Sequence, residues 1–180
     1  EAVHAKGSFI YLQLWALGRA ADPTQLKKEF GPDAEVKSSG NVPFEGGATP
    51  TPLTEEEIKE YIELYAQAAK NSIEAGFDGV EIHGANGYLI DQFTQDNANN
   101  RTDAYGGSVE KRARFGIEVA KAVVEAVGAD KTGIRLSPFS TFQGMKMKDP
   151  KPQFSYLAQE LKKLKLAYIH VVESRISGNA

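Results

Sequence analysis

The chain has 180 residues, 41% hydrophobic and 25% charged, which are ordinary proportions for one globular unit with a hydrophobic core. Its 21 basic and 24 acidic residues leave a net charge of -3 without a basic cluster, which argues against nucleic acid or an anionic membrane as a partner. The absence of cysteine excludes disulfides and thiolate nucleophiles, and no apolar run approaches the roughly 18 residues of a membrane span. We therefore expect a soluble, cytoplasmic protein whose ligand is a small molecule.

The first residues, EAVHAKGSF, have the pattern of a helix end, because a small residue, a cation and a glycine follow one another at Ala5, Lys6 and Gly7. There is no initiator methionine, so we expect a piece of a longer chain. Residues 8–15, SFIYLQLW, are rich in β-forming residues and almost wholly apolar. This pattern predicts a strand that is covered on both faces.

The segment 18–53 carries many prolines, glycines and charges and is too long for a passive connection. We interpret it as a functional lid or a partly mobile loop. A helix follows, because Thr54 is suited to its N-cap position and Glu57, three residues later, completes a capping box. An apolar stripe at helical spacing continues from there, and Gly76 ends it.

Strands and helices then alternate to the end of the chain. The expected elements are a strand at 77–83, a helix between Ser108 and Gly128, a strand at 132–138, a helix at 154–165 and a buried strand at 167–173. With the first strand and helix, the order is β-α-β-α-β-α-β. Such alternation predicts right-handed crossovers and a parallel sheet that binds ligands at the carboxyl ends of its strands.

Two α/β architectures compete for this pattern. A doubly wound sheet would carry a G-x-G-x-x-G turn after a strand, and the nearest approach, GANG at 84–87, has the wrong spacing. A (β/α)8 TIM barrel instead places polar residues at strand ends, where Gln13, His83, Arg135 and Glu173 stand. Because a full barrel takes roughly 250 residues, we predict that residues 1–180 form one partial domain, half of a TIM barrel.

The stretch GVEIHGANGYLIDQF, residues 79–93, carries the most chemistry. If the chain turns at Gly84, His83 and Asn86 can donate to one oxygen, as in an oxyanion hole. A phenol, whose ordinary pKa is about 10, donates a proton only to a strongly basic atom. Tyr88 beside this pair therefore suggests that an enolate is stabilised and then protonated. The alternative for His83 is a structural histidine at a strand end.

A metal site is not expected. The three histidines stand at positions 4, 83 and 170 and have no ligand spacing.

Two further polar residues lie in apolar strands. Arg135, in TGIRLSP, is expected to be buried and so to need an anionic or strongly accepting partner. That partner is either Glu81 on the preceding strand or an electron-rich ring that gains negative charge during reaction. Gln13, in YLQLW, is either a bridging core glutamine or a ligand of the edge of a flavin or nicotinamide ring.

Taken together, these segments resemble the old yellow enzyme family of FMN-dependent ene-reductases. The resemblance rests on GVEIHGANGYLIDQF, then NRTDAYGGSVEKRARF, then GIRLSP, in the order and spacing of the family. It covers essentially the whole chain, from the family's third barrel strand to its sixth, and SFIYLQLWALGRA is similar to the fungal type.

The resemblance implies a role for each candidate residue. Gln13 would bind the pyrimidine edge of the flavin, and Arg135 would lie by its N1 and O2 region. His83 and Asn86 would bind the carbonyl oxygen of an α,β-unsaturated substrate, so that the β-carbon accepts hydride from flavin N5. Tyr88 would then protonate the α-carbon from the opposite face.

Other segments have supporting roles in this resemblance. Trp15 and Phe142 resemble walls of a substrate pocket, although Trp15 is also compatible with an ordinary core position. RTDAYGGS resembles a scaffold that fixes the loop before a helix. The family's strands that complete the flavin contacts and form the phosphate site would lie outside this chain, so only the ring-facing half of the cofactor site is expected.

The resulting hypothesis is the central part of an NADPH-dependent flavin oxidoreductase with a ping-pong cycle: NADPH reduces FMN, and reduced FMN reduces an enone or enal. One alternative is an inactive half-barrel, a scaffold or excised fragment without bound flavin. Another is a barrel enzyme that uses Arg135 for an anionic substrate without flavin. Open strand edges at 8–15 and 167–173 also predict homo-oligomers.

Overall fold

The computed structural model describes residues 1–173 and contains a four-stranded parallel sheet in the order β1-β4-β5-β6. The strands are β1 Tyr11–Leu14, β4 Gly79–Gly84, β5 Thr132–Leu136 and β6 Tyr168–Val171. Their order in the sheet is their order in the chain, as in consecutive β/α units of a barrel. The predicted parallel α/β arrangement is therefore confirmed.

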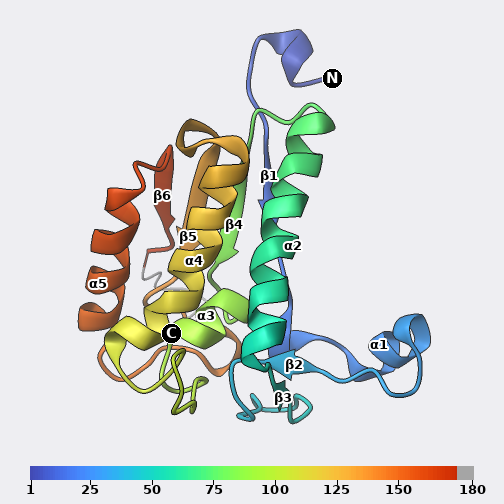
Figure 1. The fold of residues 1–180 in the computed structure, drawn as a ribbon, viewed down its shortest axis with the longest axis vertical. Coiled ribbons are helices and arrows are strands. Elements are labelled where there is room, and N and C mark those ends of the chain that lie inside the picture. The colour runs from blue at the N-terminus through green and yellow to red at the C-terminus, as the bar shows by residue number, and fades with distance from the viewer. Residues whose placement is uncertain (174–180) are drawn as a thin grey trace.

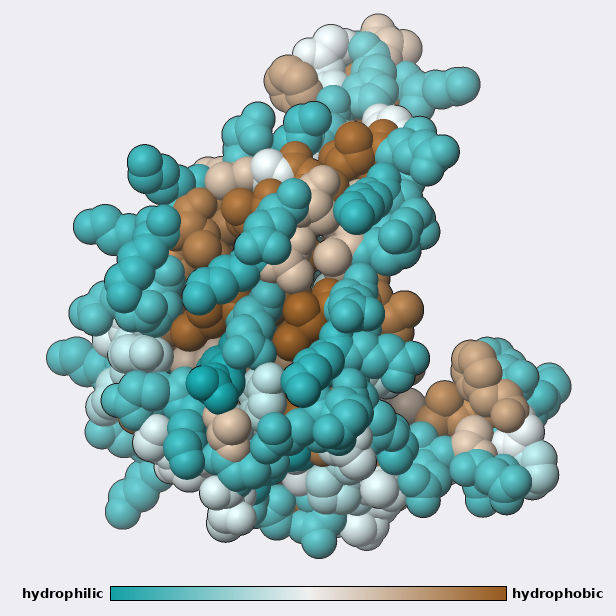
Figure 2. Space-filling model, in the orientation of Figure 1, coloured by the Kyte–Doolittle hydropathy of each residue, from teal (hydrophilic) through white to brown (hydrophobic). Residues whose placement is uncertain are grey.

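Three long helices, α2 Glu55–Glu74, α4 Val109–Val127 and α5 Pro150–Lys163, lie side by side over one face of the sheet (Figure 1). Figure 2 views the same face, where hydrophilic residues cover the helices and hydrophobic residues show in the seams between them. No helix among residues 1–173 is long and apolar enough to cross a membrane. The carboxyl ends of the strands point to the lower side of Figure 1, away from the N-terminus.

The helix starts follow their sequence signals. Thr54 Oγ1 accepts from the Glu57 amide at 3.1 Å, and the Glu57 carboxylate accepts from the Thr54 amide at 2.8 Å, which completes the predicted capping box. The Ser108 hydroxyl caps α4 by accepting from the Lys111 amide at 3.3 Å. Helix α5 begins four residues earlier than predicted, at Pro150, because proline is tolerated in the first turn of a helix.

The core lies between the sheet and the helices. Val80 and Ile82 of β4 and Ile134 of β5 are fully buried there. The rings of Phe93 and Phe115 belong to the same core and lie 4.4 Å apart between centroids. Because successive side chains of a strand point to opposite faces, Glu81 and His83 of β4 lie on the other face, away from the helices.

The segment 18–53 has structure of its own. It contains the helix α1 Pro23–Phe30, which Asp22 caps, and a two-stranded parallel ladder of β2 Lys37–Ser38 and β3 Thr51–Pro52. Figure 1 places this segment at the carboxyl ends of the strands, with α1 projecting from the body. Its role as a lid stays a prediction.

The predictions that the first strand is covered on both faces and that the last strand is buried are wrong. Strand β1 holds only four residues, with Leu12 37% exposed, and in β6 Ile169 is 36% and Val171 48% exposed. The reason is their position, because β1 and β6 are the two edges of the sheet and within residues 1–173 each pairs on one side only. An apolar pattern indicates that a strand is suited to burial, but whether it is buried depends on which elements lie beside it.

Exposed edges of this kind predict self-association. We expect the isolated chain to form oligomers or aggregates in size-exclusion chromatography with light scattering, and Ile169→Lys on β6 to reduce them, because lysine on an edge strand opposes pairing. The control is Phe30→Lys on α1, which makes the same exchange at a residue that is 74% exposed and remote from both edges. A monodisperse monomer of the unaltered chain would contradict the prediction.

Candidate active site

Two rows of side chains cross the sheet face that the helices leave open. The strand register aligns His83 with Arg135 and His170, and one step earlier it aligns Gln13 with Glu81. The residues of one row therefore stand side by side on the same face. Since His83 is at the carboxyl end of β4, the row of His83, Arg135 and His170 lies where the barrel architecture places active sites.

Three of the predicted site residues meet as rings beside this row. Trp15 follows β1, His83 lies near the end of β4, and Tyr88 precedes the short helix α3 Leu89–Thr94. The centroids are 5.1 Å apart for His83 and Tyr88, 4.9 Å for Trp15 and Tyr88, and 6.4 Å for Trp15 and His83. The structure thus brings the His83 imidazole and the Tyr88 phenol into contact, with the Trp15 indole beside both rings.

The turn between His83 and Tyr88 has an unusual backbone. Asn86 and Gly87 have φ angles of 56° and 76°, in the left-handed region, which asparagine tolerates better than most side chains. A Cβ on Gly87 would lie 2.8 Å from Met145 Cγ, so only glycine fits here. The Asn86 amide donates to Ser137 Oγ at 2.7 Å, which ties the turn to the residue after β5.

His83 is buried, with 6% of its surface exposed. Burial, and after it the charge of the neighbouring Arg135, lower the pKa of its imidazole to about 4. At neutral pH the ring is therefore uncharged and donates one N–H. This suits a neutral donor to a carbonyl oxygen, and the residues described contain no group of three or more potential metal ligands.

Arg135 and Glu81 do not form the ion pair that the sequence left open. The Glu81 carboxylate accepts from Gln13 Nε2 at 2.6 Å and contacts His170 Nδ1 at 3.0 Å. Burial alone would raise the pKa of Glu81, but hydrogen bonds from Gln13, His170 and Tyr168 outweigh burial and lower it.

Arg135 itself is half-buried, against the expectation of full burial, because its side chain points to the open face. Its buried Nε has no hydrogen-bond partner among residues 1–173. Gln13 is also exposed rather than a bridging core residue, and its amide oxygen is left for another partner while its Nε2 donates to Glu81. These two side chains fit the edge of a ring that carries both acceptors and donors.

Phe142 is 51% exposed, and its carbonyl oxygen lies 3.2 Å from the Cβ position of Gly87. Its segment therefore packs against the turn that carries Asn86. Arg19, which the sequence analysis missed, secures this packing by donating to the carbonyl oxygens of Val42 and Gln143, both at 2.9 Å.

Two buried polar residues of α3 were also missed. Gln92 accepts from the Arg19 amide at 3.0 Å and donates to the Gly87 carbonyl at 2.7 Å, so it links the loops after β1 and β4. Asp91 is fully buried beside it. The available signal was two polar residues inside the apolar run LIDQF.

The RTDAYGGS stretch acts as a scaffold, as its resemblance implied. Arg101 pairs with Asp103 at 2.6 Å and donates to the carbonyl oxygens of Ser39 at 2.9 Å and Leu53 at 2.6 Å. It therefore holds two parts of the segment 18–53 against the loop that contains Arg101.

Residues 1–180 match the sequence profile of the NADH:flavin oxidoreductase / NADH oxidase family. The chain belongs to this family of FMN-dependent oxidoreductases.

Individual members of the family match most or all of this chain. The chain is 66% identical over 180 residues to a chanoclavine-I aldehyde reductase of Penicillium roqueforti, covering 100% of this chain and 48% of the relative. It is 53% identical over 178 residues to a protein of Claviceps purpurea named "Probable inactive dehydrogenase", covering 97% of this chain and 46% of the relative. The chain thus spans about half the length of the curated relatives it matches.

The structure resembles that of Old Yellow Enzyme from a Pichia species, with a TM-score of 0.87 and 44% identity over 96% of this chain and 49% of the other. The resemblance to the old yellow enzyme family and the predicted half of a TIM barrel are therefore confirmed.

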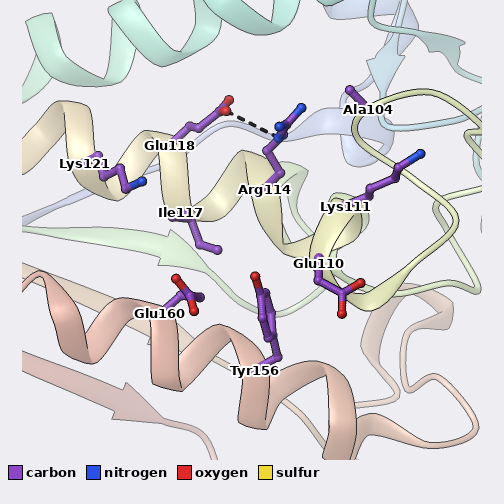
Figure 3. Close-up of a pocket in the computed structure, with 9 residues that line it drawn as sticks. All are labelled: Ala104, Glu110, Lys111, Arg114, Ile117, Glu118, Lys121, Tyr156 and Glu160. Atoms are coloured by element: carbon purple, nitrogen blue, oxygen red, sulfur yellow. Dashed lines mark ion pairs between the residues drawn. The ribbon is translucent and has the colours of Figure 1, made fainter.

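This flavin oxidoreductase segment also has a groove of about 510 Å³ between α4 and α5 (Figure 3). Its acidic and basic side chains interleave, and one pair, Arg114 and Glu118, lies 3.7 Å apart. The groove is lined by Ala104, Glu110, Lys111, Arg114, Ile117, Glu118, Lys121, Tyr156 and Glu160. It belongs to the helix layer, on the face opposite His83, and is a solvated seam rather than part of the site.

The neutral state of His83 is testable by nitrogen NMR of its ring. We expect the ring to stay uncharged from pH 8 down to about pH 5, because its pKa is lowered to about 4. Arg135→Met should raise this pKa only partly, because burial is the larger cause and remains. A midpoint at or above the ordinary histidine value of about 6.5 in the unaltered chain would contradict the assignment.

Proposed function

We propose that this chain is the central part of an NADPH-dependent flavin oxidoreductase that reduces the C=C bond of an α,β-unsaturated carbonyl compound, an enone or an enal. The observation that carries the proposal is the contact of the uncharged His83 with Tyr88, at 5.1 Å between ring centroids, at the carboxyl end of β4. A neutral donor beside a phenol suits the formation of an enolate and its protonation.

Gln13 and Arg135 would hold the ring of FMN. The unpartnered Nε of Arg135 supports this role, because a buried N–H without an acceptor favours a ligand that supplies one. The fixed guanidinium charge also favours a ring that becomes negative on reduction. Bound FMN would supply hydride, taken from NADPH, to the β-carbon of the substrate.

His83 and Asn86 would hold the carbonyl oxygen of the substrate. This oxygen gains negative charge as the β-carbon accepts hydride, and hydrogen bonds to a charged oxygen are about twice as strong as neutral ones. The pair therefore stabilises the transition state more than the bound substrate, as catalysis requires. An imidazole that is already neutral provides this donor without any change of its own protonation state.

Tyr88 would give its proton to the α-carbon of the enolate. Its ring contacts both His83 and Trp15, which limits its movement and keeps the phenol close to the donor pair. Trp15 and Phe142 are exposed in this chain, and we propose that they wall the substrate pocket and exclude water from the enolate.

Two rival functions have specific support. The relative named "Probable inactive dehydrogenase" favours a barrel that keeps the fold without the reaction. The unpaired Arg135 would also suit an anionic substrate in a barrel that binds no flavin. Flavin absorbance that stays with the purified protein, directly or after FMN is added and unbound FMN is removed, argues against a barrel that binds no flavin. Oxidation of NADPH that depends on an enone argues against an inactive barrel.

The reaction is best tested in a complete barrel. We define the host barrel as the Penicillium roqueforti relative with this chain in place of the 180 residues that it matches, where identity is 66%. In this host, Tyr88→Phe should leave the reduction of flavin by NADPH nearly unchanged, because that half-reaction needs no proton from a phenol. Reoxidation by an enone should slow by about 10² to 10⁴-fold, the usual contribution of a positioned acid.

Rapid-mixing absorbance measures each half-reaction separately. Reoxidation by oxygen, which needs no such donor, should keep its rate. The control is Tyr156→Phe on α5, which removes the same hydroxyl outside the site. An enone rate in Tyr88→Phe equal to that of the unaltered host would remove Tyr88 as the proton donor.

A further inference from the structure

The structure contains a buried carboxylate that the proposed chemistry does not use. Asp91, in the first turn of α3, has no exposed surface. Its Oδ2 accepts from the Gly87 amide at 2.9 Å and from the Ser137 hydroxyl at 3.4 Å, and its Oδ1 accepts from Gln95 Nε2 at 2.9 Å. Three donors therefore bind one buried carboxylate, and one of them is the amide of Gly87 in the turn that follows β4.

Ser137 extends this network by one step. Its Oγ accepts from the Asn86 amide at 2.7 Å while its hydroxyl donates to Asp91. The amides of two consecutive residues are thus connected to the same carboxylate. Gly87 donates to Asp91 directly, and Asn86 reaches it through the Ser137 hydroxyl. Because Ser137 comes two residues after Arg135, the network also joins the turn to the strand that carries the guanidinium.

The turn requires such support. Asn86 and Gly87 both have left-handed backbones, and a residue with a side chain occupies that region at a cost in free energy. Strained backbones of this kind persist where surrounding contacts over-determine them. With both amides directed to the buried network, hydrogen bonds to Ser137 and Asp91 fix the conformation of the turn.

We propose that Asp91, acting in part through Ser137, is a positioning residue that fixes the backbone of Asn86 and Gly87 and thereby aligns Asn86 and Tyr88 with His83. The inference rests on the proposed function in one respect, because the aligned donors are taken to bind the substrate oxygen. Pre-positioned donors need no reorganisation at the moment of reaction, which is the main source of their effect.

The network needs a carboxylate rather than an amide. Ionised aspartate only accepts hydrogen bonds, so it satisfies all three donors, whereas asparagine would turn its NH₂ group either toward Gln95 or toward both Gly87 and Ser137. Burial raises the pKa of Asp91 to about 6, while its hydrogen bonds and the charge of Arg19 oppose the rise. At neutral pH the side chain is therefore ionised and has its full capacity to accept.

The first test uses the host barrel, because the isolated chain is expected to self-associate, and it needs no substrate. Amide hydrogen exchange followed by NMR at pH 7 should be faster at both Asn86 and Gly87 in Asp91→Asn, by roughly 10- to 100-fold, the worth of a hydrogen bond to a charged group. In Ser137→Ala only the Asn86 amide should lose protection, because Gly87 donates to Asp91 directly. Amides of β4 and α4 report whether the fold is kept.

The matched control is Asp96→Asn, an exposed aspartate just beyond the same helix, which should change neither amide. Ser137→Ala keeps the proposal testable if Asp91→Asn does not fold. Unchanged exchange at Asn86 in both variants would overturn the proposal.

The second test asks whether the alignment matters for binding. In the host barrel, a phenol whose phenolate mimics the enolate should bind roughly tenfold more weakly to Asp91→Asn, while flavin reduction by NADPH keeps its rate. Faster exchange with unchanged phenol affinity would also overturn the proposal, since the turn would then have only a structural role. If the unaltered host binds no phenol, the proposed function fails, and the exchange test still decides whether Asp91 fixes the turn.

Discussion

The alternation of side chains along β4 is the constraint on which the site depends. Val80 and Ile82 point into the core, and this commits Glu81 and His83 to the opposite face. A shift of one residue in register would bury a carboxylate and an imidazole among helices and expose two aliphatic side chains. The parallel register with β1 and β5 then places Gln13 and Arg135 beside them. The chemistry of the open face is therefore a consequence of how the core packs.

Burial is the main reason that His83 stays neutral; the charge of Arg135 adds to its effect on the pKa, and the charge of Glu81 opposes it. Arg135 stands next to it in register, and the Glu81 carboxylate, one step away, is engaged by Gln13 and His170. A free carboxylate beside the imidazole would favour the imidazolium, and the guanidinium opposes it. The same guanidinium suits an anionic ring, so one residue serves both the proposed cofactor and the protonation state of the donor.

Signals that are local in sequence predicted local structure correctly. The capping box at Thr54 and Glu57 and the cap at Ser108 are formed as expected, because each depends on residues within one helical turn. The aromatic contacts of His83 and Tyr88 within the stretch 79–93 follow from their closeness in the chain. The family resemblance could be recognised from the same short stretches.

Features that depend on distant partners were not predictable in this way. An apolar pattern indicated burial for β1 and β6, but exposure is decided by which strands lie beside them. The pairing of Arg135 with Glu81 was plausible from adjacent strands, yet Gln13 and His170 occupy that carboxylate. Asp91 was not recognised as a candidate from the sequence, because its partner Ser137 is 46 positions away.

The most direct measurement of the proposed reaction is the identity of the product that the host barrel forms from an enal. An enal offers two reducible bonds, and the relative from Penicillium roqueforti is named an aldehyde reductase. Donors that hold the carbonyl oxygen as an enolate, with a phenol placed to protonate carbon, predict the saturated aldehyde as the first product by NMR or mass spectrometry. An allylic alcohol formed with the C=C bond intact would contradict alkene reduction at this site.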